Sequence, residues 1–139
     1  MNYLNTPISS NEIIMVDDSE VDSYIIQKCL VRSKLKNKFV YFDSGDKFLN
    51  YMHQVESGNS PVPAVVLLDI NMPMMDGFEV LEKVRSNKRF CDIPNFIMFS
   101  SSNNPKEVSR AHDLKADYQE KFLNYQDTVN FLDSLANNV

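Results

Sequence analysis

The 139-residue sequence lacks the features that mark several large classes of protein. Its only two cysteines, Cys29 and Cys91, have neither CxxC nor metal-ligand spacing, so we expect reduced structural thiols in a cytoplasmic protein. No apolar run approaches a membrane span and no secretory signal opens the chain, so we expect no membrane insertion. The net charge of −5 argues against a nucleic-acid partner. Without repeats, low-complexity tracts or long linkers, the chain fits one domain.

The sequence does contain an alternation of strand-like and helix-like segments. Apolar, β-branched or aromatic runs predict five strands, at residues 12–16, 38–42, 64–69, 95–99 and 116–120. Apolar spacing and start signals predict helices over residues 19–32, 44–55, 79–85, 105–114 and 126–136. In the first helix we expect Val21, Ile25 and Cys29 to share a face, with Ile26 and Leu30 beside them.

Continuous rather than alternating apolarity is typical of strands in a parallel sheet that is covered on both faces. With right-handed crossovers, the alternation predicts a doubly wound α/β domain. In such sheets, ligands bind outside the carboxyl ends of the strands. This explains why the apolar run Ala64–Leu68 stops at a carboxylate, Asp69: that strand end opens into a cleft.

Polar side chains gather at the predicted strand ends. Asp17 and Asp18 follow the first strand and Asp69 ends the third, so three carboxylates converge if these strands are neighbours. Such carboxylates repel one another unless a cation compensates them, and Mg²⁺ prefers oxygen ligands. Ser100 and Lys121 end the fourth and fifth strands. Acids, a metal, a hydroxyl and a lysine suit a phosphoryl-transfer site, in which an aspartate can be the nucleophile.

Four segments in this order make the chain resemble the receiver domain of two-component response regulators: IIMVDD, LLDINMPMMDG, IMFSSS and ADYQEKF. The resemblance runs from about Glu12 to the C-terminus. It implies a five-stranded parallel sheet with the flavodoxin-like strand order 2-1-3-4-5. We therefore expect a short N-terminal extension over residues 1–11 and a receiver domain over residues 12–139. We expect no output domain, because only residues 137–139 follow the last predicted helix.

The resemblance assigns a role to each residue of the predicted site. These are the phosphoacceptor Asp69; the Mg²⁺ ligands Asp17, Asp18, Asp69 and the backbone carbonyl of Asn71; the phosphoryl contacts Ser100 and Lys121; the aromatic switch Tyr118; and Asn71 and Ser102, which tune dephosphorylation. The implied phosphoryl donor is a histidine kinase or a histidine phosphotransfer protein, and the implied output is binding to a downstream protein target. We expect the chain to catalyse its own phosphoryl transfer and dephosphorylation without being a conventional enzyme.

Two positions depart from the family pattern. Phe122 stands where proline usually follows the lysine, so we expect a trans peptide bond and a differently shaped loop. Lys115 stands where glycine is common, which alters the expected turn before the fifth strand. Two other functions stay open: an interaction module that phosphorylation does not control, and a phosphatase with Asp69 as nucleophile. The phosphatase would usually need a second acid at position 71, where this chain has Asn71.

Overall fold

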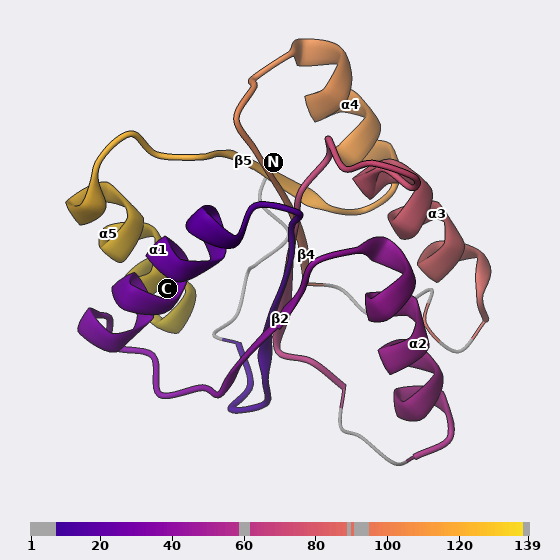
Figure 1. Cartoon of the computed structure of the whole chain (residues 1–139), viewed down its shortest axis with the longest axis horizontal. Helices are drawn as coiled ribbons and strands as arrows, with labels where there is room; N and C mark the ends of the chain where they lie inside the picture. Colours follow the sequence, from indigo (N-terminus) through magenta and orange to yellow (C-terminus); the bar gives the residue numbers. More distant parts are fainter. Residues whose placement is uncertain (1–7, 59–61, 89, 91–94, 138–139) are drawn as a thin grey trace.

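A computed structural model describes residues 8–58, 62–88, 90 and 95–137, and in this part of the chain five strands alternate with five helices (Figure 1). They are β1 (Ile13–Val16), α1 (Glu20–Arg32), β2 (Phe39–Phe42), α2 (Gly45–Glu56), β3 (Val65–Leu68), α3 (Gly77–Ser86), β4 (Phe96–Ser100), α4 (Pro105–Asp113), β5 (Asp117–Glu120) and α5 (Tyr125–Asn137). Each predicted element is confirmed, with ends that differ by at most two residues.

The five strands form one parallel sheet in the order β2-β1-β3-β4-β5, which confirms the predicted doubly wound topology. Helices α1 and α5 cover one face, and α2, α3 and α4 cover the other (Figure 1). The register pairs Val16 of β1 with Leu68 of β3. The residues that follow them, Asp17 and Asp69, therefore leave the sheet side by side.

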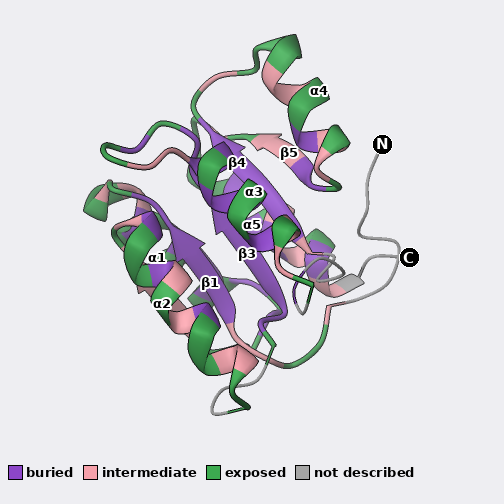
Figure 2. Ribbon diagram, turned by 90° about the vertical axis from the view of Figure 1, so that its right-hand side faces the viewer, coloured by how far each residue is buried: buried purple, intermediate pink, exposed green. Residues whose placement is uncertain are grey.

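The core consists of two apolar layers, one on each face of the sheet. Alternate residues of the central strands serve the two layers: Ile13 and Met15 pack toward α1 and α5, whereas Ile14 and Val16 pack toward the other three helices. Figure 2 shows the central strands as the most continuously buried part of the fold. This burial on both faces explains the unbroken apolar runs in the sequence.

The buried face of α1 differs from the expected one. Ile26, Cys29 and Leu30 are buried as expected, but Val21 and Ile25 are 69% and 40% exposed. At about 100° per residue, Val21 lies on the side of the helix opposite to the centre of the buried face. The expectation of a shared face for Val21, Ile25 and Cys29 is therefore wrong for Val21 and only marginal for Ile25.

The structure describes one of the two cysteines, and it bears on the expectation about membrane segments. Cys29 is a fully buried free thiol, and burial raises its pKa, which agrees with a structural role. Cys91 lies outside the described residues. Among the residues that the structure describes, no helix combines the length and the apolarity that crossing a membrane requires.

Lys115 and Phe122 are both accommodated locally. Lys115 has a φ of +60°, so it adopts the left-handed conformation that glycine usually supplies, and its backbone N–H donates to the His112 carbonyl at 2.9 Å. The following N–H, of Ala116, donates to the Ala111 carbonyl at 2.9 Å, which completes a Schellman turn after α4. The Lys121–Phe122 peptide bond is trans, as expected, and the Phe122 ring packs on Phe131 of α5 with a centroid distance of 5.7 Å.

Candidate functional site

The carboxyl ends of β1 and β3 bring three aspartates together, as the sequence predicts. One carboxylate oxygen from each of Asp17, Asp18 and Asp69 lies within 4.8 Å of the others. The ladder hydrogen bond from the Asp69 N–H to the Val16 carbonyl, at 2.9 Å, fixes this proximity. Asp17 is 1% exposed and Asp69 is 7% exposed, whereas Asp18 is exposed. The cluster therefore has two buried members and one at its mouth.

Burial disfavours the ionised forms of Asp17 and Asp69. Burial, reinforced by the charges of Asp17 and Asp18, raises the pKa of Asp69 to about 6. Burial also raises the pKa of Asp17, although hydrogen bonds from Lys121 and Ser19 oppose the shift. Clustered hard oxygen donors of this kind fit a divalent cation such as Mg²⁺, which would stabilise the charges of all three carboxylates. Asn71, the proposed carbonyl ligand, follows Asp69 on the same loop and is itself exposed.

Lys121 reaches this cluster from the end of β5. Its Nζ donates at 2.7 Å to Asp17 Oδ2 and lies 3.6 Å from Asp69 Oδ1, as expected for a lysine of this site. It donates equally closely, at 2.7 Å, to Asp22 Oδ2 in the first turn of α1. Burial opposes its charge, but the hydrogen bonds to Asp17 and Asp22 and the nearby carboxylates raise the pKa of Lys121 above its ordinary value. Lys121 therefore keeps its positive charge.

Ser100 ends β4 beside Lys121 and is fully buried. Its carbonyl accepts a hydrogen bond from the Lys121 backbone N–H at 2.7 Å, so the two residues are joined through the sheet. Its hydroxyl oxygen accepts from the Ser102 N–H at 3.3 Å. The predicted hydroxyl is therefore at the same edge of the sheet as the aspartates.

Tyr118 is held in place by the loop that follows β4. Its hydroxyl donates to the Ser102 carbonyl at 2.6 Å and lies 3.2 Å from Glu107 Oε1. The Ser102 hydroxyl in turn donates to Glu107 Oε1 at 2.7 Å. The Tyr118 ring is half-buried against the layer formed by α2, α3 and α4. Ser102, predicted to tune dephosphorylation, is thus engaged with Tyr118 in this structure.

Two further residues support the aspartates. The Tyr41 hydroxyl, on β2, donates to the backbone carbonyl of Asp17 at 2.7 Å. Gly77, the first residue of α3, lies so close to the third strand end that a Cβ atom there would be 2.1 Å from the Asp69 carbonyl oxygen. The glycine of the MDG sequence is therefore required by the close approach of two main-chain segments.

The sequence interpretation missed Asp22, Tyr41 and Glu107. Asp22 carried a usable signal, because it is the third aspartate within six residues, at the start of a helix that leaves the predicted site. Tyr41 and Glu107 carried none, since the reach of their side chains depends on the twist of β2 and the position of α4.

Comparisons with known proteins agree with this geometry. A family model described as the response regulator receiver domain matches residues 13–127. Response regulator Rcp1 of Synechocystis is 32% identical over 117 residues, which cover 83% of this chain and 79% of Rcp1. A probable methanogenesis regulatory protein, FilR2 of Methanothrix harundinacea, is 27% identical and covers 83% of this chain and 74% of FilR2.

Solved structures give the same result. The Mn²⁺-bound form of Rcp1 superposes with a TM-score of 0.75 at 29% identity, covering 89% of this chain and 90% of the other. The phosphorylated cyanobacterial phytochrome response regulator RcpA has a TM-score of 0.77 at 27% identity, covering 94% of this chain and 91% of the other.

Proposed function

The chain belongs to the response regulator receiver family, and from this premise we propose that it accepts a phosphoryl group on Asp69 from a histidine kinase or a histidine phosphotransfer protein. One observation carries the proposal: Asp69 is a nearly buried carboxylate at the end of a central strand, beside two acids and facing a lysine. A carboxylate oxygen of Asp69 would attack the phosphorus atom, and the bond from phosphorus to the donor histidine nitrogen would break.

We propose Mg²⁺ as the cofactor, held by Asp17, Asp18, Asp69 and the backbone carbonyl of Asn71. The oxygen donor set of the three aspartates supports this choice, and a relative has been crystallised with Mn²⁺ bound. When bound, the ion supplies positive charge that offsets the clustered acids and the phosphoryl oxygens.

Lys121 and Ser100 would then contact the phosphoryl oxygens. Lys121 is a fixed cation 3.6 Å from Asp69 Oδ1, so it needs little movement to pair with a group attached there. The buried Ser100 hydroxyl can donate its proton to an acceptor oxygen, because its present hydrogen bond with Ser102 uses only its oxygen. Asn71 and Ser102 would flank the path of the water that hydrolyses the phosphoryl group.

A change at Tyr118 would carry the signal to the surface. If Ser100 turns toward the phosphoryl group, the Ser102 N–H loses its acceptor, and Ser102 is the residue that holds the Tyr118 hydroxyl. The hydrogen bonds among Tyr118, Ser102 and Glu107 connect β5 to the start of α4, so their rearrangement would alter the surface of α4, β5 and α5. The size of this population shift is limited by the differential contacts of the phosphoryl group with the two states.

The donor would dock over the carboxyl edge of the sheet, because its histidine must reach Asp69. Three exposed apolar side chains surround this edge: Val21 of α1, Met74 of the loop after β3 and Leu123 of the loop after β5, with exposures of 69%, 97% and 104%. A donor protein docked here would bury these side chains, and their burial would favour its binding. A cytoplasmic location fits such partners and the two cysteines.

A magnesium titration with and without acetyl phosphate tests the proposal. We expect Mg²⁺-dependent phosphorylation of the parent and at least tenfold weaker Mg²⁺ binding in Asp18→Asn, because a carboxylate ligand is lost. Asp113→Asn, which removes an exposed acid at the end of α4, is the matched control and should bind Mg²⁺ as the parent does. Equal Mg²⁺ affinity in the two variants, or phosphorylation without a divalent cation, would contradict the proposed site.

A further inference from the structure

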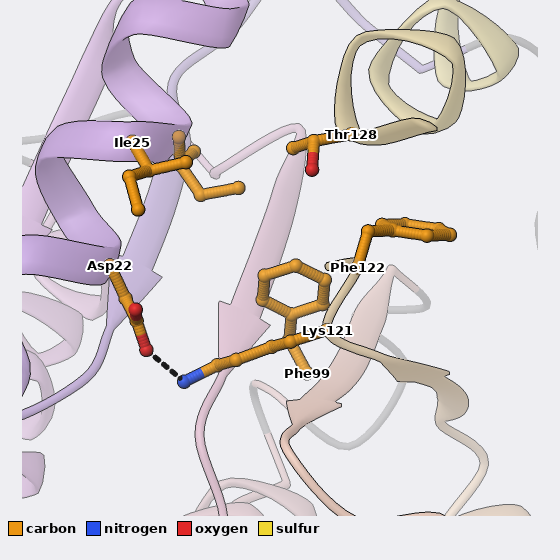
Figure 3. Close-up of a pocket in the computed structure, with 7 residues that line it drawn as sticks. Asp22, Ile25, Phe99, Lys121, Phe122 and Thr128 are labelled. Carbon is orange, nitrogen blue, oxygen red and sulfur yellow. Dashed lines mark hydrogen bonds and ion pairs between the residues drawn. The ribbon is translucent and has the colours of Figure 1, made fainter. Parts of the chain in front are cut away.

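Lys121 divides its hydrogen bonds between the acid cluster and α1. Its Nζ lies 2.7 Å from Asp17 Oδ2 and 2.7 Å from Asp22 Oδ2, but 3.6 Å from Asp69 Oδ1. Figure 3 shows the Lys121 side chain extended toward α1, with its amine directed at Asp22. In this state Lys121 therefore donates its close hydrogen bonds to Asp17 and Asp22, and Asp69 is its more distant ion-pair partner.

The local structure of α1 places Asp22 for this contact. Ser19 caps the helix and accepts the Asp22 N–H at 3.2 Å, so the first turn is fixed. An acid in a first turn is also favourable to the helix dipole, but Glu20 supplies the same charge from an exposed position. Helix α1 therefore does not need the ion pair between Asp22 and Lys121 for its own stability.

The two close partners of Lys121 differ in how they tolerate its departure. The Asp17 side chain is 1% exposed and belongs to the proposed cation site, where a bound ion would replace Lys121 as its counter-charge. The Asp22 side chain is 34% exposed, so water can solvate it when Lys121 leaves. With a cation bound, Asp22 is the partner with which a phosphoryl group on Asp69 would compete for Lys121.

We infer that Asp22 is a positioning residue that holds Lys121 toward α1 until a phosphoryl group on Asp69 takes over the lysine. This inference rests on the proposed function of Asp69. The exchange is one ion pair for another, with no covalent step at Asp22 or Lys121. Asp22 thereby opposes the phosphorylated state. It also links that state to the pocket between α1 and α5, which Lys121 lines together with Ile25, Phe122 and Thr128.

The test compares Asp22→Asn, Asp22→Glu and Glu20→Gln in their affinity for beryllofluoride, a phosphoryl mimic, at saturating Mg²⁺. We expect Asp22→Asn to bind about two- to fivefold more tightly than the parent, the range for a partly exposed ion pair. Asp22→Glu keeps a carboxylate at this position and should bind beryllofluoride as tightly as the parent does. Glu20→Gln removes the same charge from the same turn and should also match the parent. Equal affinities of Asp22→Asn and Glu20→Gln, or weaker binding by Asp22→Asn, would overturn the inference.

A second measurement separates the role of Asp22 from the proposed function. The NMR signal of the Lys121 ammonium group, recorded without ligand, should shift in Asp22→Asn and not in Glu20→Gln. If the parent fails to bind beryllofluoride, the proposed function is wrong, and this signal still tests the contact. An unchanged Lys121 signal in Asp22→Asn would show that Asp22 does not hold the lysine.

Discussion

Replacing Gly77 with alanine tests how closely the fold holds the phosphoacceptor strand. Gly77 begins α3, and its backbone N–H donates to the Ile70 carbonyl at 2.8 Å. An added Cβ would lie 2.1 Å from the Asp69 carbonyl oxygen and 2.9 Å from the Asp69 carbonyl carbon. These are main-chain atoms, so a rotamer change cannot relieve the clash and either α3 or the end of β3 must move.

The magnitude follows from that displacement. The Asp69 carbonyl oxygen and the new methyl group, 2.1 Å apart, must separate by about 1.3 Å more to reach an ordinary contact of 3.4 Å. Overpacking of this kind costs about 1–3 kcal/mol, whereas replacing glycine restricts the unfolded chain and recovers about 0.4–1 kcal/mol. We therefore expect Gly77→Ala to lower the free energy of unfolding by about 1–2 kcal/mol. A shift of about 1 Å at a reacting group can slow a reaction as much as a hundredfold, so phosphorylation by acetyl phosphate should slow about ten- to hundredfold.

Urea denaturation and the rate of phosphorylation by acetyl phosphate measure the two effects. Gly45→Ala is the matched control, because Gly45 is the first residue of α2 and its added Cβ would meet side chains, with Val80 Cγ2 at 2.5 Å. That variant should also lose stability but should retain most of the phosphorylation rate. A Gly77→Ala protein with the stability and rate of the parent would refute the reasoning, as would an equal loss of rate in both variants.

Three further predictions concern the turn before β5, the acid cluster and the switch. Lys115→Gly should raise the free energy of unfolding, measured by urea denaturation, by about 0.5–1 kcal/mol. The left-handed conformation of Lys115 costs about 1–2 kcal/mol, and the greater entropy of glycine in the unfolded chain offsets part of the gain from removing that cost. A less stable variant would contradict this. Burial raises the pKa of Asp69 to about 6, so protons compete with the metal for this carboxylate below that pH. Calorimetry should therefore find Mg²⁺ binding about tenfold weaker at pH 5 than at pH 7.5. Equal affinities at the two pH values would show that Asp69 does not titrate in this range. Ser100→Ala should uncouple the NMR signal of the Tyr118 ring from beryllofluoride binding, and Ser100→Thr should retain the coupling and tighten it, because threonine has a more restricted rotamer; an identical Tyr118 response in Ser100→Ala and the parent would break the proposed link.

The sequence predicted the fold well because the strands of a parallel sheet differ from their surroundings in composition. Residues such as Val65–Leu68 are buried on both faces, so their apolar runs are unbroken and their ends are polar. The helix faces were harder to predict. Val21 and Ile25 are apolar but exposed, and no rule of spacing distinguishes an apolar residue that packs on the sheet from one at the mouth of a site.

The strand-end argument found the part of the site that follows directly from strands. Asp17, Asp69, Ser100 and Lys121 all occupy the carboxyl edge of the sheet, as predicted. Asp22 reaches the same edge from a helix, and its contribution depends on the rotation of α1 about its own axis. The residues at the strand ends contain no information on the rotation of α1, so the strand-end argument did not find the ion pair between Asp22 and Lys121.

The central claim is that Asp69 is the phosphoacceptor, and intact-protein mass spectrometry tests it most directly. The parent and Asp69→Asn are each incubated with acetyl phosphate and Mg²⁺ and then weighed, with Asp113→Asn as a control for the loss of one acid. We expect one added phosphoryl group on the parent and on Asp113→Asn, and none on Asp69→Asn. Phosphorylation of Asp69→Asn to the same extent as the parent would contradict the assignment.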